Sequence, residues 1–157
     1  MGLKQELNFK KDFIIREHEA LLNIYYTSNI LKKRAVEFFN KYSITDVQFN
    51  VLELIYHQSD EKKGLTQVEL SDMLLVNRAN ITTLIDRMEK LNLVIRESVP
   101  GDRRYNIIKL TPFGLDKLKK VEGNYLKEIN TVMDILSNKE LTELMNICEK
   151  IRKRLKR

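Results

Sequence analysis

Polar side chains gather on one face of a helical segment, and their types suit contact with nucleic acid. The residues on this face are Asn77, Arg78, Ala79, Asn80, Thr82, Thr83 and Arg87. Arginine can pair with guanine and asparagine with adenine, and the methyl groups of threonine and alanine can contact thymine. We therefore predict that this face reads base edges in the major groove of double-stranded DNA. An ordinary solvated surface is the alternative for this segment taken alone.

A second polar group lies at the tip of an expected hairpin, where Asp102, Arg103 and Arg104 follow a Pro-Gly pair. An arginine at the end of a narrow two-stranded wing can enter the minor groove, whose negative potential is strongest over A·T-rich DNA. Asp102 would repel phosphates unless it is paired, and we expect it to orient one neighbouring arginine. The two groups together favour DNA contact over a solvated surface.

Motifs for catalysis, metal binding and redox chemistry are missing from the sequence. Five glycines leave little scope for a phosphate-binding loop, and there is neither a His-Glu-x-x-His motif nor a nucleophile elbow. The single cysteine, Cys148, excludes an internal disulfide, and we expect a buried inert thiol there rather than a peroxide sensor. His18 and His57 lack partners in a usual ligand spacing. We expect no enzyme, no cofactor and no metal site.

A short helix, a tight turn and a second helix must position the polar residues. Thr66 and Glu69 form a capping box at the start of the short helix, whose core-facing residues are expected to be Leu70, Met73 and Leu74. The second helix has one apolar face, formed by Ile81, Leu84, Ile85, Met88 and Leu91. Asn92 can take the left-handed conformation that ends a helix. Strands at residues 93–98 and 105–110 complete a winged helix-turn-helix lobe over residues 45–111.

Amphipathic helices are also expected around the two helices and the hairpin that carry the polar residues. One covers residues 13–39, and Thr45 with Gln48 caps the next helix through about residue 59. The core face of that next helix is expected to be Val47, Val51, Leu54 and Ile55. Thr111 before Pro112 predicts the start of another long helix.

Ser137 and Glu140 cap the last expected helix, whose apolar residues recur in steps of three and four. Such a row needs a partner helix. We therefore predict a dimer interface formed by Leu141, Leu144, Cys148, Ile151 and Leu155. The fold class is mainly α with a small β-hairpin wing. Residues 1–157 form a single domain, in which a winged helix-turn-helix is flanked by N- and C-terminal dimerisation helices at residues 9–42 and 112–157.

Residues 65–114 carry a further pattern, in which an aspartate and an arginine precede an apolar strand that ends in Leu-Thr with a glycine nearby. The residues that meet it are Asp102, Arg104, Leu110, Thr111 and Gly114. In this pattern, and in the order of its flanking helices, the chain resembles the MarR family of regulators of multiple antibiotic resistance. It departs at Leu75 and Asn92, where the family often has glycine. Leucine disfavours a positive φ, so a different turn geometry is expected at Leu75.

The resemblance implies a transcriptional regulator, by expectation a repressor, that works as a homodimer. Two-fold symmetry would set two recognition helices about 34 Å apart, which predicts a pseudo-palindromic operator. The resemblance also implies release by a small-molecule effector bound between the dimerisation helices and the DNA-binding lobe. Phe13, Tyr25 and Tyr26, with Phe9 nearby, are candidates to line a pocket for an aromatic or phenolic effector. Packing in a dimer core is the alternative for these aromatic residues.

Charge is distributed unevenly along the chain. The net charge is +6, with +3 on residues 1–44, −1 on residues 45–111 and +4 on residues 112–157. The lobe that should read DNA is therefore not basic overall, and a basic tail at residues 150–157 is either a solvated helix end or a secondary phosphate contact. An architectural DNA-binding dimer with little sequence preference, and a winged helix used for protein pairing, remain alternatives. A polar N-terminus and the lack of a long apolar stretch predict a cytoplasmic protein without membrane contact.

Overall fold

The computed structural model describes residues 2–59, 64–74, 78–99 and 102–156, without the side chains of residues 78, 99 and 102–105. Within these residues the chain forms seven helices and three strands. The helices are α1 (Leu3–Glu6), α2 (Arg16–Asn40), α3 (Asp46–Gln58), α4 (Gln67–Leu74), α5 (Arg78–Lys90), α6 (Pro112–Met133) and α7 (Asn138–Leu155). The strands are β1 (Leu65–Thr66), β2 (Val94–Val99) and β3 (Asp102–Leu110).

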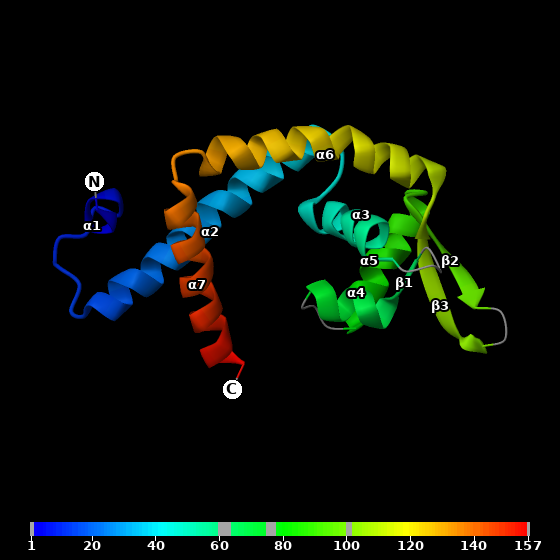
Figure 1. The fold of residues 1–157 in the computed structure, drawn as a ribbon, viewed down its shortest axis with the longest axis horizontal. Coiled ribbons are helices and arrows are strands. Elements are labelled where there is room, and N and C mark those ends of the chain that lie inside the picture. The colour runs from blue at the N-terminus through cyan, green and yellow to red at the C-terminus, as the bar shows by residue number, and fades with distance from the viewer. Residues whose placement is uncertain (1, 60–63, 75–77, 100–101, 157) are drawn as a thin grey trace.

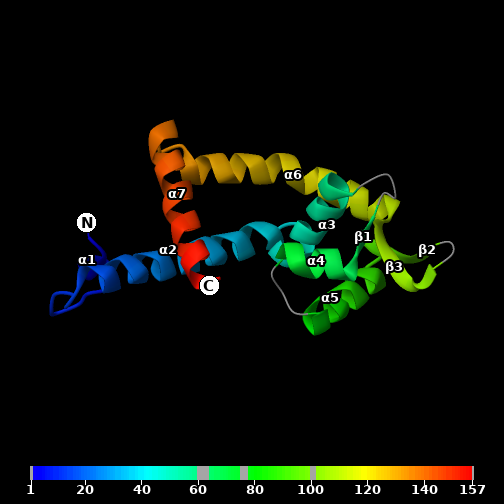
Figure 2. The same ribbon diagram turned by 60° about the horizontal axis from the view of Figure 1, so that its bottom comes forward.

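The two long helices α2 and α6 form an arm that carries a small lobe at one end (Figure 1). The lobe consists of α3, α4, α5 and the sheet, and α7 crosses α2 at the other end of the arm (Figure 2). An ion pair between Arg34 Nε of α2 and Glu128 Oε1 of α6, at 2.5 Å, joins the two long helices. The arrangement places α5 in the lobe and α7 at the opposite end of the arm.

The sheet has three antiparallel strands in the order β1-β3-β2. The hairpin pairs Val94 with Leu110 and Arg96 with Ile108, and its register is interrupted between Ser98 and Val99. β1 adds two residues to the other edge of β3. The predicted two-stranded wing is therefore confirmed, with β1 as an addition that sequence reasoning missed.

The hydrophobic core lies inside the lobe and at its junction with the two long helices. Side chains from all these elements are fully buried, and the largest of them are Phe39, Phe49, Leu52, Leu70, Ile81, Ile85, Met88, Ile108 and Leu118. α7, in contrast, has no buried residue. One chain therefore completes the core of its lobe but leaves its last helix without a packed face.

Helix starts follow the local capping signals in the sequence. The Thr45 side chain accepts from Gln48 N at 3.2 Å, and Glu140 N donates to Ser137 Oγ in the same way at 3.4 Å. Thr111 Oγ1 accepts from Gly114 N at 2.9 Å ahead of the proline that opens α6. These side chains satisfy amide groups that the first helical turn leaves without a partner.

Three of the expected core residues are wrong. Val47 is 37% exposed, Met73 46% and Leu91 52%. The neighbouring Phe49 and Ser71 are buried instead of Val47 and Met73. The cause is geometric, because α3 and α4 present a slightly rotated face to the core, and the helical period alone does not fix that rotation. Leu91 follows the last residue of α5, where the chain turns away toward β2.

Candidate nucleic-acid interface

α5 presents a polar face to solvent, while its opposite face is buried. Ile81, Ile85 and Met88 are at most 1% exposed and belong to the core of the lobe. The predicted DNA-reading side chains that the structure describes on this helix are all exposed, namely Ala79, Asn80, Thr82, Thr83 and Arg87. A major groove accepts one α-helix that is held from behind by its apolar side. The geometry of α5 meets that requirement.

Several predicted contact residues are described only in part. Asn77, Leu75 and the Pro100-Gly101 turn lie outside the described residues. Arg78 begins α5, and Asp102 begins β3 with Arg103 and Arg104 directly after it, but the side chains of all four lie outside the description. The backbone nevertheless places the three wing residues at the far end of the β2–β3 hairpin (Figure 1). Their contact with DNA stays a prediction.

Arg96 of β2 braces the wing against α5. Its Nη2 atom lies 2.5 Å from Asp86 Oδ1, and its Nη1 atom donates to Glu89 Oε2. The backbone amide of Arg96 also donates to Glu89 Oε1 at 3.0 Å. One guanidinium therefore engages two carboxylates of α5, and its fork of donors fixes the angle between helix and wing. Sequence reasoning missed this residue, because the partners lie 10 and 7 positions away and share no local pattern with it.

Gln67, the first residue of α4, links α5 to the same brace. Its amide group lies 3.1 Å from Thr82 Oγ1 and from the Nε and Nη2 atoms of Arg96, and it donates to the threonine while its oxygen accepts from the arginine. Thr82, a predicted base-contacting residue, is thus held by a side chain from the preceding helix. The three elements of the helix-turn-helix and wing form one connected polar network.

The end of α5 is joined tightly to the start of α6. Asn92 has a φ of 56°, and Thr111 Oγ1 donates to its carbonyl at 2.5 Å. A Cβ atom on Gly114 would lie 1.9 Å from the carbonyl oxygen of Leu93, so only glycine fits there. The Leu-Thr-x-x-Gly pattern noted in the sequence therefore has a structural reason. It allows α6 to pass directly over the turn that follows α5.

The predicted dimer-interface residues form an exposed row on α7. Leu144 is 43% exposed, Ile151 37% and Leu155 79%, and Leu141 and Cys148 are half-buried. Further large apolar side chains are exposed on α2, including Leu21, Ile24 and Ile30. Apolar area of this kind on helices that share one end of the molecule is typical of an interface with another chain.

The candidate effector residues are not brought together into one cavity. Phe13 is half-buried, and its ring centroid lies 5.6 Å from that of Phe9 and 6.0 Å from that of His18. Tyr25 is 59% exposed on α2, and Tyr26 beside it is half-buried. A shallow hollow on α2 is lined instead by Arg16, Glu17, Glu19, Ala20 and Asn23 and by none of the candidate aromatic residues. An effector pocket at these aromatic residues remains a prediction.

The expectation that His57 has no partner in ligand spacing is wrong. Glu122 Oε1 of α6 lies 2.9 Å from His57 Nε2, and Glu53 precedes the histidine by one turn of α3. The proximity of Glu53 to His57 could have been predicted from the sequence, since residues four apart share one face of a helix. The Glu122 contact joins positions 65 apart and had no sequence signal.

None of the helices within the described residues combines the length and hydrophobicity that crossing a bilayer requires.

Comparisons with known proteins agree on one family of transcriptional regulators. The profile of the MarR family matches residues 42–104. The HTH-type transcriptional regulator MhqR of Bacillus subtilis (strain 168) is 30% identical over 116 residues, which are 74% of each chain.

Two solved structures extend the similarity to nearly the whole fold. AbsC, a MarR family transcriptional regulator from Streptomyces coelicolor, matches with a TM-score of 0.81 and 22% identity over 93% of this chain and 99% of AbsC. A mutant of MarR from E. coli, solved in complex with operator DNA, matches with a TM-score of 0.72 and 26% identity over 89% of this chain and 99% of that one. The flanking helices are therefore included in the similarity, as well as the winged lobe.

Proposed function

The chain belongs to the MarR family of transcriptional regulators, and from this premise we propose that it binds duplex DNA as a homodimer. In this proposal α5 enters the major groove and the tip of the β2–β3 hairpin reaches the adjacent minor groove. The observation that carries the proposal is the exposed polar face of α5. The opposite, apolar face of this helix is buried in the lobe, and Arg96 holds the helix to the wing. A solved complex of a mutant MarR with operator DNA, to which this chain is similar in fold, supports DNA as the partner.

Dimerisation sets the form of the DNA site. The exposed apolar row of α7 and the exposed apolar residues of α2 support pairing through the arm. A two-fold axis would then relate two copies of α5 about 34 Å apart, one turn of the double helix. We propose that the operator is a pseudo-palindrome, that binding represses transcription, and that the protein works in the cytoplasm. Members of the family are transcriptional regulators rather than enzymes, and no catalytic role is proposed.

Release by a small aromatic or phenolic molecule completes the proposal. A site between the arm and the lobe would let a ligand change the distance between the two reading helices. Such a ligand acts only through a difference in its affinity for the DNA-bound and free forms. Of the candidate residues, Tyr26 is half-buried on the arm itself and is the side chain that we expect to contact it. Phe13 precedes α2 at the end of the arm away from the lobe, so in one chain it is too far from such a site.

Selection of binding sites from random duplexes tests the proposal, followed by anisotropy titrations on the selected site. We expect an inverted repeat, a weakening of about 10-fold for Arg103→Ala and for Arg104→Ala, and relaxed base preference at one half-site position for Asn80→Ala. Lys119→Ala and Asn124→Ala remove comparable side chains from exposed positions of α6 and should bind normally. Normal binding by all three interface variants would falsify the assignment. A steep salt dependence without an enriched sequence would instead favour an architectural dimer.

A further inference from the structure

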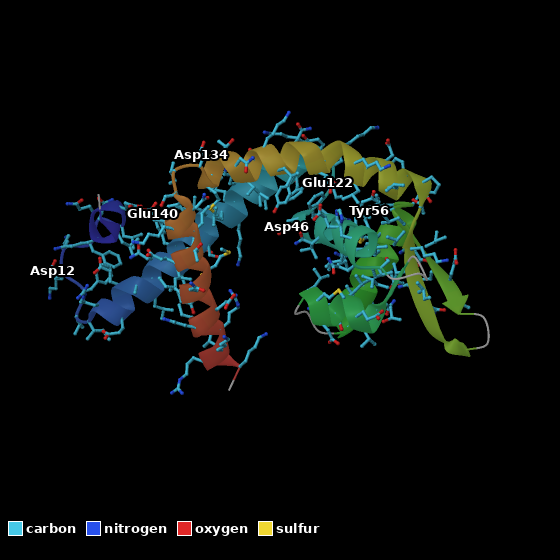
Figure 3. All side chains as sticks on the ribbon, viewed as in Figure 1. Asp12, Asp46, Tyr56, Glu122, Asp134 and Glu140 are labelled. Carbon is cyan, nitrogen blue, oxygen red and sulfur yellow. The ribbon has the colours of Figure 1, made fainter. Side chains whose placement is uncertain are left out.

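Three side chains with metal-binding atoms meet between α3 and α6, away from the proposed DNA face. Glu53 and His57 lie one turn apart on α3, and Glu122 comes from α6. One ligand atom from each of them lies within 4.8 Å of the other two. Figure 3 shows Glu122 on the side of α6 that faces α3. We propose that these residues bind one divalent transition-metal ion, of which Zn²⁺ is the best match, and that the ion cross-links α3 to α6.

Geometry supports a common ion for the three ligands. His57 Nε2 and Glu122 Oε1 are 2.9 Å apart, and a small outward movement of either side chain brings them to about 3.4 Å, the separation of two tetrahedral ligands on an ion with bonds near 2.1 Å. Glu53 shares the helix face of His57 because the two residues are four apart. A small rotation of its flexible side chain brings its carboxylate to the same point. The imidazole can then coordinate in its neutral form, with the ion in place of the proton shared with Glu122.

Charge at the cluster favours a cation. Glu53 and Glu122 bring two carboxylates to the single imidazole of His57. A divalent ion would neutralise the repulsion between these two carboxylates.

The donor set selects the class of metal. One imidazole nitrogen with two carboxylates suits Zn²⁺ and similar transition metals, whereas Mg²⁺ and Ca²⁺ prefer oxygen ligands alone. The side chain of His57 is 44% exposed and that of Glu122 30%, so an ion can enter from solvent. Water can fill the remaining coordination position.

A regulatory consequence follows, and this part rests on the proposed function. α3 belongs to the winged lobe, whereas α6 continues along the arm toward α7, which carries the predicted dimer interface (Figure 1). An ion that links them fixes the orientation of the lobe on the arm, and thus the spacing of the two reading helices. By thermodynamic linkage, metal binding and DNA binding then affect each other, typically by about 5- to 150-fold.

Titration of the full-length protein with Co²⁺, followed by displacement with Zn²⁺, tests the site without DNA. We expect a visible absorption band that saturates at one ion per chain, and a higher thermal midpoint with Zn²⁺ but not with Mg²⁺. His57→Asn and Glu122→Gln should each lower the affinity at least about 10-fold. Glu53→Gln provides a third variant that does not disturb the contact between α3 and α6.

His18→Asn is the matched control, because it removes the other histidine of the chain and leaves the cluster intact. Metal binding that survives in His57→Asn, or that is lost in His18→Asn, overturns the site whatever the protein does with DNA. Anisotropy on the selected operator, with Zn²⁺ or with a chelator, then tests the regulation. DNA affinity that is equal in the two conditions overturns the regulatory role, whereas no specific DNA binding in either condition overturns the proposed function and leaves the metal site standing.

Discussion

The winged lobe and the helices that flank it differ in what a single chain completes. The lobe buries Phe49, Ile85 and Ile108 fully and braces its polar face with ion pairs. The last helix, α7, has no buried residue and exposes an apolar row. Charge differs in the same way, since residues 45–111 carry −1 and residues 112–157 carry +4. The core of the winged lobe is complete within one chain, whereas the exposed apolar row of α7 is covered only in the dimer that we propose.

This difference also explains why charge is a poor guide to the interface. The acidic residues of α5 that lower the net charge of the lobe are those that hold Arg96. They have a structural task on the side of the helix toward the wing, and the opposite polar face keeps Arg87 exposed. Placement of a few charges matters more for reading bases than the total charge does.

The largest expected effect comes from breaking the flanks. Leu144→Asp puts a charge into the exposed row of α7 and should yield a monomer by sedimentation. Because one half-site contact is then lost, specific DNA binding should fall by about 10³-fold, or about 4 kcal/mol. Asn146→Asp adds the same charge to α7 outside the row and should leave a dimer. A monomeric Leu144→Asp protein that binds the operator normally would show that the flanks are not needed.

Substitutions in the core of the lobe should lower the stability of the protein and leave its assembly unchanged. Ile85→Ala empties a fully buried position and should lower the free energy of unfolding by about 3 kcal/mol in urea titrations. Met73→Ala truncates a side chain of the same lobe that is 46% exposed, and it should cost less than about 1 kcal/mol. Equal losses for the two variants would contradict the orientation of α4 described above.

The same contrast separates what sequence could and could not predict. Local signals were reliable, since the capping pairs at Thr45, Thr66 and Ser137 and the left-handed Asn92 all depend on a few adjacent residues. β1 was missed because two residues become a strand only by pairing with the distant Ile107 and Ile108. Rotation of each helix, which exposed Met73 in place of Ser71, also depends on contacts that no local pattern contains.

The residues of the candidate site also fall into two groups, those predictable from local sequence and those that depend on distant contacts. The exposed polar residues of α5 follow from the period of its apolar residues, so the sequence was enough to place them. The brace formed by Arg96 and the cluster formed by His57 and Glu122 each join distant elements. Side chains that touch DNA can thus be proposed from local pattern, whereas side chains that hold the reading surface in place require the fold.

The smallest expected effect comes from the contact that holds the wing to α5 inside the lobe. Arg96→Ala removes the brace between wing and reading helix and should weaken operator binding about 10-fold, with the dimer unchanged. Lys109→Ala is the matched control, because its 2.5 Å ion pair with Glu97 lies within the hairpin and does not involve α5. Both variants lose one cation from the wing, so general loss of charge would weaken them equally.

A double-mutant cycle with Glu89→Gln identifies the cause of any loss at Arg96. If the guanidinium acts by holding α5, the two changes should be non-additive in DNA affinity, because both remove the contact between Arg96 and Glu89, while Asp86 keeps its own contact in Glu89→Gln. Additive losses would mean that Arg96 does not act through Glu89 and that this contact does not position the wing. The lobe would then be a set of separately placed contacts, and the contrast with the unfinished flanks would be weaker than the burial of its core indicates.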